Sequence, residues 1–446
     1  MRIVPVLLCL VVMQATAQQP SEFMLGGIQV NEPDHQAWVQ GLDAAGMNTV
    51  AVTAYAKQGD WNTDHIWWEE EEPSVLAEIE AAKAQGLKVV FIARVALDHS
   101  FPANAHFWHG MIMPATDIQL ASWFRQYTQF VVEWAQKCEA LGVEVLGIGS
   151  EMRVLSATVP TQEIPQLEGF FLNPISRYGY RALRWRHREE IQESQWWKNQ
   201  GHADYRGFLK EEVGAQTAWA KQVTYWGRLH RKDLLNERRR LIERHWRNLI
   251  EEVRQVYTGQ LTYAANFDNF HRVGFWDALD VVGINAYFPL TEATEVPQME
   301  EVVQAWIYHG NRVSETLKEL GVPKHKVLFT ELGYTRQAGT LVAPWSGFGY
   351  VFMPKGKLRY SFHLWEAMPS RLQDRASALE GLVQARALGN WPGLIGVLYW
   401  KLTTLPSMGI IEPFALVLGD GDPLEPALQS LKVEDTKPDG FQVEKK

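Results

Sequence analysis

The chain has 446 residues, of which 46% are hydrophobic and 21% are charged, a balance typical of a globular protein with a large core. Its formal net charge of -9 argues against a nucleic acid or an anionic membrane surface as the main partner. No segment after the N-terminus approaches the roughly 20 consecutive apolar residues of a membrane-spanning helix, so we expect no membrane span.

The N-terminus has the pattern of a secretory signal peptide. Arg2 precedes an apolar run over residues 3–13, and small residues at 15–17 resemble a cleavage site. The apolar run is too short to cross a membrane. We therefore expect residues 1–17 to be removed, with cleavage after Ala17, and the mature protein to be secreted or periplasmic.

Eight short apolar stretches alternate with helix-like segments along the rest of the chain, and each is typical of a buried parallel strand. There is no glycine-rich phosphate-binding fingerprint. The pattern therefore predicts a closed α/β barrel, the (β/α)8 or TIM barrel, rather than an open doubly wound sheet. The strands are expected within 23–30, 49–55, 88–96, 143–152, 261–266, 281–287, 326–334 and 394–401. Helices are expected over 34–45, 74–86, 118–140, 274–278, 300–320 and 371–388.

Two segments depart from this alternation. Residues 154–259, after the fourth strand, are helix-prone, rich in Arg, Glu and Trp, and longer than an ordinary connection. Their basic aromatic stretches could bind nucleic acid or an acidic polymer, but interleaved glutamates favour a salt-bridged helical insertion. We expect the barrel with this insertion to occupy 18–419, and residues 420–446 to form a polar, loosely held tail.

Two carboxyl groups are predicted at the C-terminal ends of the strands, where barrels of this kind carry their sites. The fourth strand ends at Glu151 and the seventh at Glu331. Such a pair can hydrolyse a glycosidic bond, because one group protonates the leaving oxygen while the other attacks the anomeric carbon. A separation of roughly 5 to 5.5 Å gives retention of configuration. These glutamates are the candidate catalytic residues.

The other side chains predicted at this face are amides, phenols and indoles, which suit a sugar. Histidines in the loop after the third strand, among them His106 and His109, lack metal-ligand spacing. We interpret them as non-ligand residues and predict neither a metal nor a cofactor. The candidate substrate-binding residues are Trp108, Ser150, Asn266, Asn285, Tyr287, Trp345 and Trp400, with Asp268 and Tyr334 expected at the same face.

Five segments carry a resemblance to a known group of enzymes. They are 123–124 (WF), 148–152 (IGSEM), 262–266 (TYAAN), 275–290 (FWDALDVVGINAYFPL) and 328–334 (LFTELGY). In this order and spacing they resemble glycoside hydrolase clan A, and more narrowly glycoside hydrolase family 113, the β-mannanase family. The resemblance covers most of the predicted barrel.

This resemblance implies Glu151 as the acid/base and Glu331 as the nucleophile. It also implies that Tyr287 hydrogen-bonds the nucleophile and that Trp400 forms the floor of the subsite for the reacting sugar. Such roles call for hydrogen-bond donors that lower the pKa of Glu331, and for apolar or carboxylate neighbours that raise the pKa of Glu151.

The leading hypothesis is a secreted or periplasmic retaining β-glycosidase whose partner is an oligo- or polysaccharide, either a β-mannan or a related β-linked glycan. Two positions depart from the family pattern, since Ser150 replaces the Asn of many clan members and Asn285 an Asp frequent in the family. A non-catalytic carbohydrate-binding barrel therefore stays open, as does an interaction protein that uses the helical insertion. Nothing in the sequence indicates the oligomeric state.

Overall fold

The computed structural model describes residues 22–432 apart from 69–70, 187, 189–203, 225–231, 293–296, 348–349, 356–357 and 364–368. The predicted signal peptide, residues 1–17, and the predicted tail from 433 onward lie outside the described residues. Within the described part of the chain, no helix combines the length and the apolar character that a membrane crossing requires.

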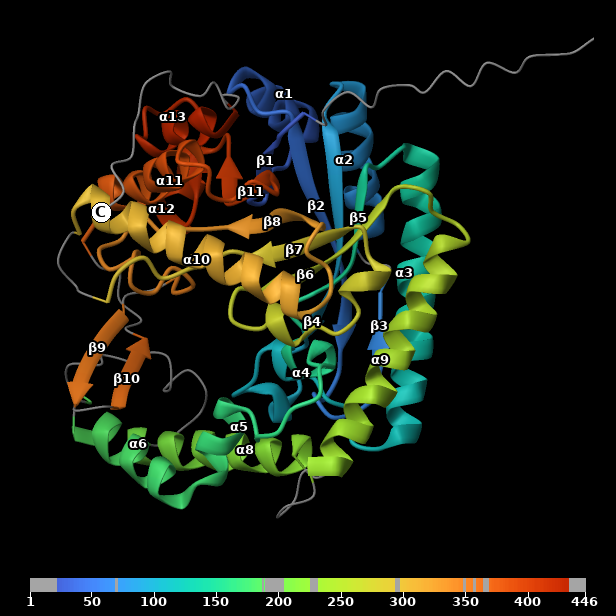
Figure 1. Ribbon diagram of the computed structural model, residues 1–446, viewed down its shortest axis with the longest axis vertical. Helices are drawn as coiled ribbons and strands as arrows, with labels where there is room; N and C mark the ends of the chain where they lie inside the picture. Colours follow the sequence, from blue (N-terminus) through green and yellow to red (C-terminus); the bar gives the residue numbers. More distant parts are fainter. Residues whose placement is uncertain are drawn as a thin grey trace, which may run out of the picture.

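Eight parallel strands form a closed barrel, as the sequence predicts (Figure 1). Each strand pairs with the next along the chain, and the first closes the circle by pairing with the last as well as with the second. Aliphatic side chains such as Met24, Val90 and Leu328 fill the interior. The barrel strands are β1 (Met24–Gln29), β2 (Thr49–Gln58), β4 (Lys88–Leu97), β5 (Val145–Ser150), β6 (Gln260–Asn266), β7 (Val281–Asn285), β8 (Lys326–Leu332) and β11 (Leu394–Thr403).

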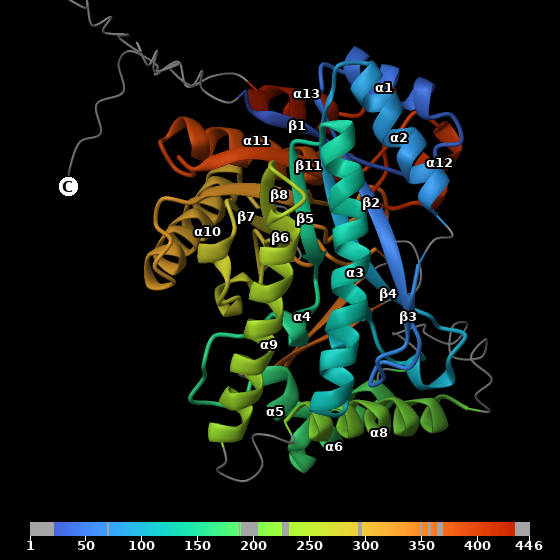
Figure 2. The same cartoon turned by 90° about the vertical axis from the view of Figure 1, so that its right-hand side faces the viewer.

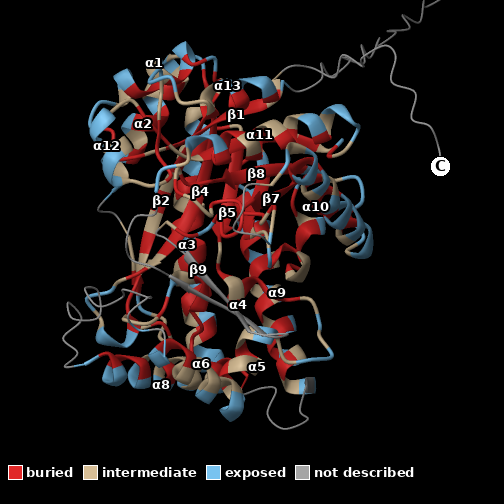
Figure 3. Ribbon diagram, turned by 90° about the vertical axis from the view of Figure 1, so that its left-hand side faces the viewer, coloured by how far each residue is buried: buried red, intermediate tan, exposed pale blue. Residues whose placement is uncertain are grey.

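Helices cover the outside of the barrel and begin and end at sequence signals. The Asp34 side chain caps α1 by accepting hydrogen bonds from the N–H groups of Gln36 and Ala37, both at 3.0 Å. Thr116 caps α3, and Gly142 ends it with a φ of 67°. Figure 3 shows buried residues concentrated on the strands and the inner faces of the helices. These barrel helices are α1 (His35–Ala44), α2 (Glu72–Ala84), α3 (Asp117–Leu141), α9 (Lys232–Arg254), α10 (Met299–Glu319) and α11 (Leu372–Ala387).

Shorter elements occupy the connections. The 3-10 helix η5 replaces the short helix predicted over 274–278. An antiparallel pair, β9 and β10, follows β8. The connecting elements are β3 (Ile66–Trp67), η1 (Pro102–Asn104), η2 (His109–Met111), η4 (Phe270–Arg272), η5 (Trp276–Ala278), β9 (Tyr350–Lys355), β10 (Leu358–His363), α12 (Pro406–Ile411) and β12 (Leu416–Val417).

The helical segment between β5 and β6 has two structurally different parts. α9 lies along α3 on the barrel wall, where the rings of Phe124 and His245 stack with centroids 4.8 Å apart. It is therefore the barrel's own helix between these strands. The described helices α5 (Gln166–Leu172), α6 (Pro174–Arg186) and α8 (Tyr205–Val223) pack on one another at one end of the molecule, next to the short α4 (Arg153–Ser156) (Figures 1 and 2).

The expectation of a loosely held tail from residue 420 is wrong for its first part. Helix α13 (Leu424–Gln429) and the 3-10 turn η6 (Ser430–Lys432) pack against α11. Leu424, Leu428 and Leu431 are buried, because their spacing of four and three residues places them on one helical face. The sequence pattern did not reveal this short apolar stripe, because most of the other residues from 420 to 446 are polar.

Glu78 of α2 is a buried carboxyl group outside the predicted site. It accepts hydrogen bonds from Nε1 of Trp38 at 3.1 Å and Nε2 of Gln29 at 3.3 Å. Burial raises its pKa from 4.5 to about 7, against the lowering effect of these two hydrogen bonds. Because the pKa is higher in the folded state, the stability that this group contributes is present below pH 4.5 and is lost as the pH rises through 7.

Glu78→Gln should therefore raise the free energy of unfolding by roughly 2–3 kcal/mol at about pH 8, and change it little near pH 4. The glutamine oxygen can still accept from Trp38, and no charge has to be buried. Urea unfolding followed by circular dichroism across this pH range measures the difference. Glu80→Gln, at an exposed position of the same helix, is the matched control. A stabilisation that is independent of pH would contradict the explanation.

Candidate active site

Glu331 lies near the end of β8 with its side chain 3% exposed. Three donors surround its carboxyl group. The Tyr287 hydroxyl donates to Oε2 at 2.5 Å, Nδ2 of Asn285 donates to Oε1 at 3.0 Å, and the Arg94 guanidinium forms an ion pair with Oε1. Because charge-assisted hydrogen bonds are strong in a buried setting, these contacts hold the carboxyl group in one orientation.

Two of the three donors to Glu331 come from the end of β7, which the barrel places beside β8, and Arg94 comes from the interior of β4. The register of β7 and β8 pairs Asn285 with Glu331 directly, and Tyr287 follows two residues later. A Cβ atom at Gly333 would lie 2.7 Å from the Tyr287 ring, so only glycine permits this close approach. Burial, together with the charge of Glu331, raises the pKa of Tyr287 well above 10. Its hydroxyl therefore stays a hydrogen-bond donor.

Glu151 directly follows β5 and has a φ of 55°, in the left-handed region that non-glycine residues seldom adopt. Its N–H donates to the carbonyl oxygen of Ala264 on β6 at 2.9 Å, which secures the turn. Its side chain is 15% exposed, and Oε2 lies 3.0 Å from Nε2 of His109. Asn285 Nδ2 donates to Glu331 and lies 3.5 Å from Oγ of Ser150, the residue before Glu151, so the barrel brings the two predicted carboxyl groups into one site.

The pKa values of the two glutamates shift in the directions opposite to those expected. Burial raises the pKa of Glu331, and the charge of Glu151 adds to this, outweighing Arg94 and the hydrogen bond from Tyr287. Burial also acts to raise the pKa of Glu151, but the hydrogen bond and charge of His109, followed by the charge of Arg94, lower it overall. The expectation is wrong for Glu331 because burial and the charge of Glu151 outweigh its donors, and wrong for Glu151 because His109 was not placed at the site.

Ser150 and Asn285, both predicted to bind substrate, lie behind Glu331. Ser150 is 1% exposed and Asn285 is completely buried. The Asn285 side chain accepts a hydrogen bond from Oγ1 of Thr330 at 2.8 Å, and its Nδ2 lies 3.5 Å from Oγ of Ser150. In this geometry both residues support the Glu331 carboxyl group, and their contact with a sugar stays a prediction.

The predicted indoles lie on elements around the two carboxyl groups. The Trp400 ring on β11 has the guanidinium carbon of Arg94 at 5.2 Å from its centroid, so it borders the Arg94–Glu331 pair. Trp345 is 40% exposed and stacks on Phe267, with centroids 5.5 Å apart. Trp108 is 36% exposed and packs edge-on against His109 at 5.1 Å. Partly exposed indoles of this kind offer flat apolar faces to a ligand.

The remaining predicted positions differ in their placement. Asn266 is half-buried at the end of β6, and Asp268 forms an ion pair with Arg153 at 2.5 Å. The expectation that Tyr334 faces the site is wrong. It is buried, and its hydroxyl donates to the carbonyl oxygen of Phe288 at 2.9 Å. The strand ends at Leu332, and the chain then turns into the core.

Sequence reasoning missed two residues of the site, Arg94 and His109. The sequence could have indicated Arg94, because it is the one charged residue in the interior of an otherwise apolar strand, β4, and a buried charge needs a partner. No sequence pattern indicates His109, since it lies in a long loop whose position depends on distant parts of the chain. Among the described residues, no group of three or more His, Cys, Asp or Glu side chains could hold a metal ion.

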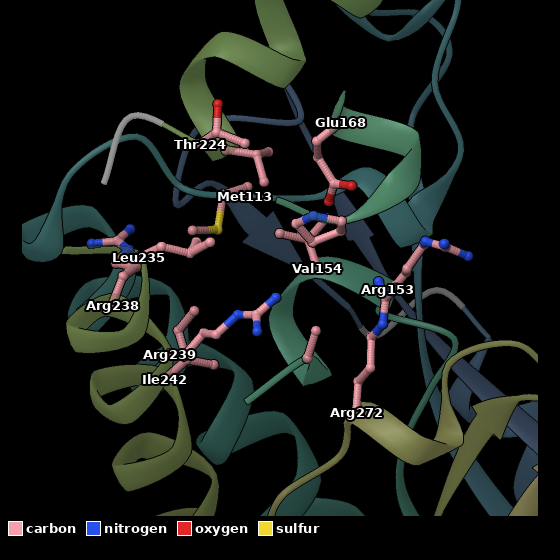
Figure 4. Close-up of a pocket in the computed structure, with 13 residues that line it drawn as sticks. Met113, Arg153, Val154, Glu168, Thr224, Leu235, Arg238, Arg239, Ile242 and Arg272 are labelled. Carbon is pink, nitrogen blue, oxygen red and sulfur yellow. The ribbon is translucent and has the colours of Figure 1, made fainter. Parts of the chain in front are cut away.

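A small cavity lies between α4, α5 and α9 (Figure 4). Its lining includes Arg153, Arg239, Arg272 and Glu168, so its chemistry differs from that of the two-glutamate site. The enclosed volume is about 20 Å³, which accommodates about one water molecule. A sugar ring does not fit there.

Solved structures show the same fold. The chain is similar to a family 113 β-mannanase from Alicyclobacillus acidocaldarius, with 15% identity, a TM-score of 0.57, and coverage of 93% of this chain and 98% of that one. It is also similar to a family 113 β-1,4-mannanase, with 16% identity, a TM-score of 0.57, and coverage of 93% and 99%. No curated protein matches the chain significantly.

The sequence itself matches a family description. The model of Glycoside Hydrolase Family 113 matches residues 28–160 and 189–373, which together make up more than half of the chain. Both glutamates and the three donors to Glu331 lie inside the matched ranges. The chain therefore belongs to glycoside hydrolase family 113.

Proposed function

We propose that this protein is a retaining β-glycosidase that hydrolyses β-mannan or a related β-linked glycan. The observation that carries the proposal is the buried Glu331 carboxyl group, held by three donors in the same site as Glu151. Two carboxyl groups in such different surroundings suit two different roles in glycoside hydrolysis. The solved family members named above are described as β-mannanases, which supports a mannan as the substrate.

The reaction proceeds in two displacements. Glu331 attacks the anomeric carbon while Glu151 gives a proton to the leaving oxygen, which forms a covalent glycosyl-enzyme and releases the first product. Glu151 then takes a proton from water, and that water attacks the same carbon and frees Glu331. Tyr287 and Arg94 orient Glu331 throughout. Two inversions leave the product with the configuration of the substrate.

The residues around the glutamates bind the sugar. Trp400 forms the floor beneath the reacting ring, while Trp108 and Trp345 stack on neighbouring rings through their exposed faces. Asn266 donates to a sugar hydroxyl from the end of β6. No step requires a cofactor.

We also propose that the protein acts outside the cytoplasm and carries an insertion that the family pattern lacks. The signal-like residues 1–17 support export, which suits a polymeric substrate. The family match leaves out residues 161–188, which hold α5 and α6. This gap supports an insertion after the fourth barrel strand that is smaller than the predicted 154–259.

The proposal is tested with residues 18–446 incubated with mannan, cellulose, xylan and their short oligosaccharides. Proton NMR during the first minutes should show the β-anomer as the initial product from a β-mannan. An initial α-anomer would exclude retention. Glycan binding by calorimetry without any released reducing end would favour the non-catalytic barrel instead.

A further inference from the structure

Helix α8 is attached to the loop that carries His109. Three side chains on one face of α8, spaced three residues apart, donate hydrogen bonds to backbone carbonyl oxygens of that loop. The central donor, Trp219, is completely buried, so its indole is an anchor rather than a surface contact. The three bonds run from Gln216 Nε2 to His106 O at 2.6 Å, from Trp219 Nε1 to Met111 O at 3.0 Å, and from Gln222 Nε2 to Met113 O at 3.0 Å.

His109 lies between the carbonyl groups that α8 holds. It opens the turn η2, within which the N–H of Met111 donates to the carbonyl of Trp108 at 2.9 Å. The Trp108 ring packs edge-on against the imidazole. On its other side, Nε2 of His109 lies 3.0 Å from Oε2 of Glu151. One continuous set of contacts thus joins α8 to Glu151.

We propose that His109 is a positioning residue that stores the proton of the acid/base Glu151, and that α8 holds it in place. This inference rests on the proposed glycosidase function. In the resting site the proton is bound to Nε2 of the imidazole and is donated in a hydrogen bond to Oε2 of Glu151. As the glycosidic oxygen approaches, the Nε2–H bond breaks, an O–H bond forms on Glu151, and that proton passes to the leaving oxygen. The imidazole is then neutral, and in the second displacement the proton that Glu151 takes from water returns to Nε2, so the cycle needs no proton from solvent.

The other ionisable groups that face Glu151 cannot take this part. Arg94 from β4 is paired with Glu331 and stays charged. Glu331 from β8 is needed as an anion. Burial raises the pKa of Tyr263, on β6, and that of Tyr287, beyond the end of β7, so both keep their protons. Imidazole is the side chain that exchanges a proton between about pH 5 and 8.

The proposal is tested by the pH dependence of kcat/KM, which reports ionisations of the free enzyme. In the wild type, the alkaline limb should follow loss of the proton shared by His109 and Glu151. In His109→Gln, which keeps a hydrogen-bond donor but stores no proton, the limb should move about one pH unit lower, with KM changed less than about twofold. His99→Gln, at an exposed position of the same loop, should leave the limb in place.

The role of α8 is tested separately. Trp219→Phe keeps an aromatic filler but removes the N–H donor, and it should move the alkaline limb in the same direction as His109→Gln. Gln222→Met removes one donor and leaves the buried indole, so it gives the same test without opening the core. Lys221→Gln, exposed on the same helix, is the control.

The outcomes separate this inference from the proposed function. If the wild type hydrolyses no glycan, the proposed function itself fails. If the wild type is active but His109→Gln loses rate equally at every pH, the imidazole has only a structural role and the inference is overturned. A limb that moves in His109→Gln but not in either α8 variant would overturn the part assigned to α8.

Discussion

Glu331→Gln should lower kcat/KM for mannooligosaccharides by roughly 10⁴-fold or more, the scale that follows removal of a nucleophile. An amide oxygen attacks an anomeric carbon far more slowly than a carboxylate does. The surroundings add to the loss, because Tyr287, Asn285 and Arg94 all present donors to this position. A glutamine must turn its own N–H₂ group towards them. Reducing-end release, measured at several enzyme concentrations, quantifies the change.

Two further variants show whether this loss belongs to the chemistry. Glu331→Asp keeps the charge that pairs with Arg94 but withdraws the carboxyl group by one methylene, and a misplacement of about 1 Å costs roughly 10²-fold. Glu78→Gln, which neutralises another buried glutamate, should leave activity unchanged. Circular dichroism must confirm folding, since an unpaired buried Arg94 costs about 3–5 kcal/mol. Activity of Glu331→Gln above roughly 1% of wild type would assign the nucleophile elsewhere.

The sequence was sufficient to predict the barrel and the proximity of the two glutamates. Buried parallel strands are continuous apolar runs, so β5 and β8 stand out from the helices beside them. Once eight such strands alternate with helices, the C-terminal ends of all strands share one face of the barrel. Glu151 and Glu331, 180 positions apart, are then brought together by topology alone.

The partners of these glutamates could not be predicted in the same way. Arg94 and Glu331 meet across the barrel interior, and no local pattern links a residue of β4 with one of β8. His109 depends on three hydrogen bonds from α8, a helix more than 90 positions further along the chain. The expected directions of the pKa shifts were wrong because the pKa of Glu331 follows burial and the charge of Glu151, and that of Glu151 follows His109, none of which the strand ends reveal.

The sequence could not separate the helix of the barrel wall from the other helices of this segment, for a different reason. Amphipathic periodicity shows that a helix has a buried face but not which surface covers it. α9 packs on α3 as part of the barrel wall, while α8 packs on α5, α6 and the loop that carries His109. The two helices therefore look alike in the sequence, although α9 belongs to the barrel wall and α8 contacts the loop that carries His109.

Removal of the Glu151 carboxyl group should slow the first step for substrates with poor leaving groups much more than for substrates with good ones. Glu151→Gly should lower kcat for mannooligosaccharides roughly 10²- to 10⁴-fold, the range for a lost general acid. The first step on 2,4-dinitrophenyl β-mannoside should be spared, because that leaving group needs no proton, so a burst of dinitrophenolate is expected. Azide, which needs no general base, should restore turnover and release a mannosyl azide.

Glycine is the informative substitution because Glu151 has a φ of 55°. Glycine adopts this conformation without strain, so activity lost in Glu151→Gly cannot come from a distorted turn, whereas Glu151→Ala keeps the steric cost. The anomer of the azide then assigns the roles. A β-mannosyl azide requires a covalent intermediate on the opposite face, formed by Glu331, while an α-mannosyl azide requires direct displacement and would reverse the two glutamates. Glu331→Gly with azide should give the α-anomer, which makes the two variants controls for each other.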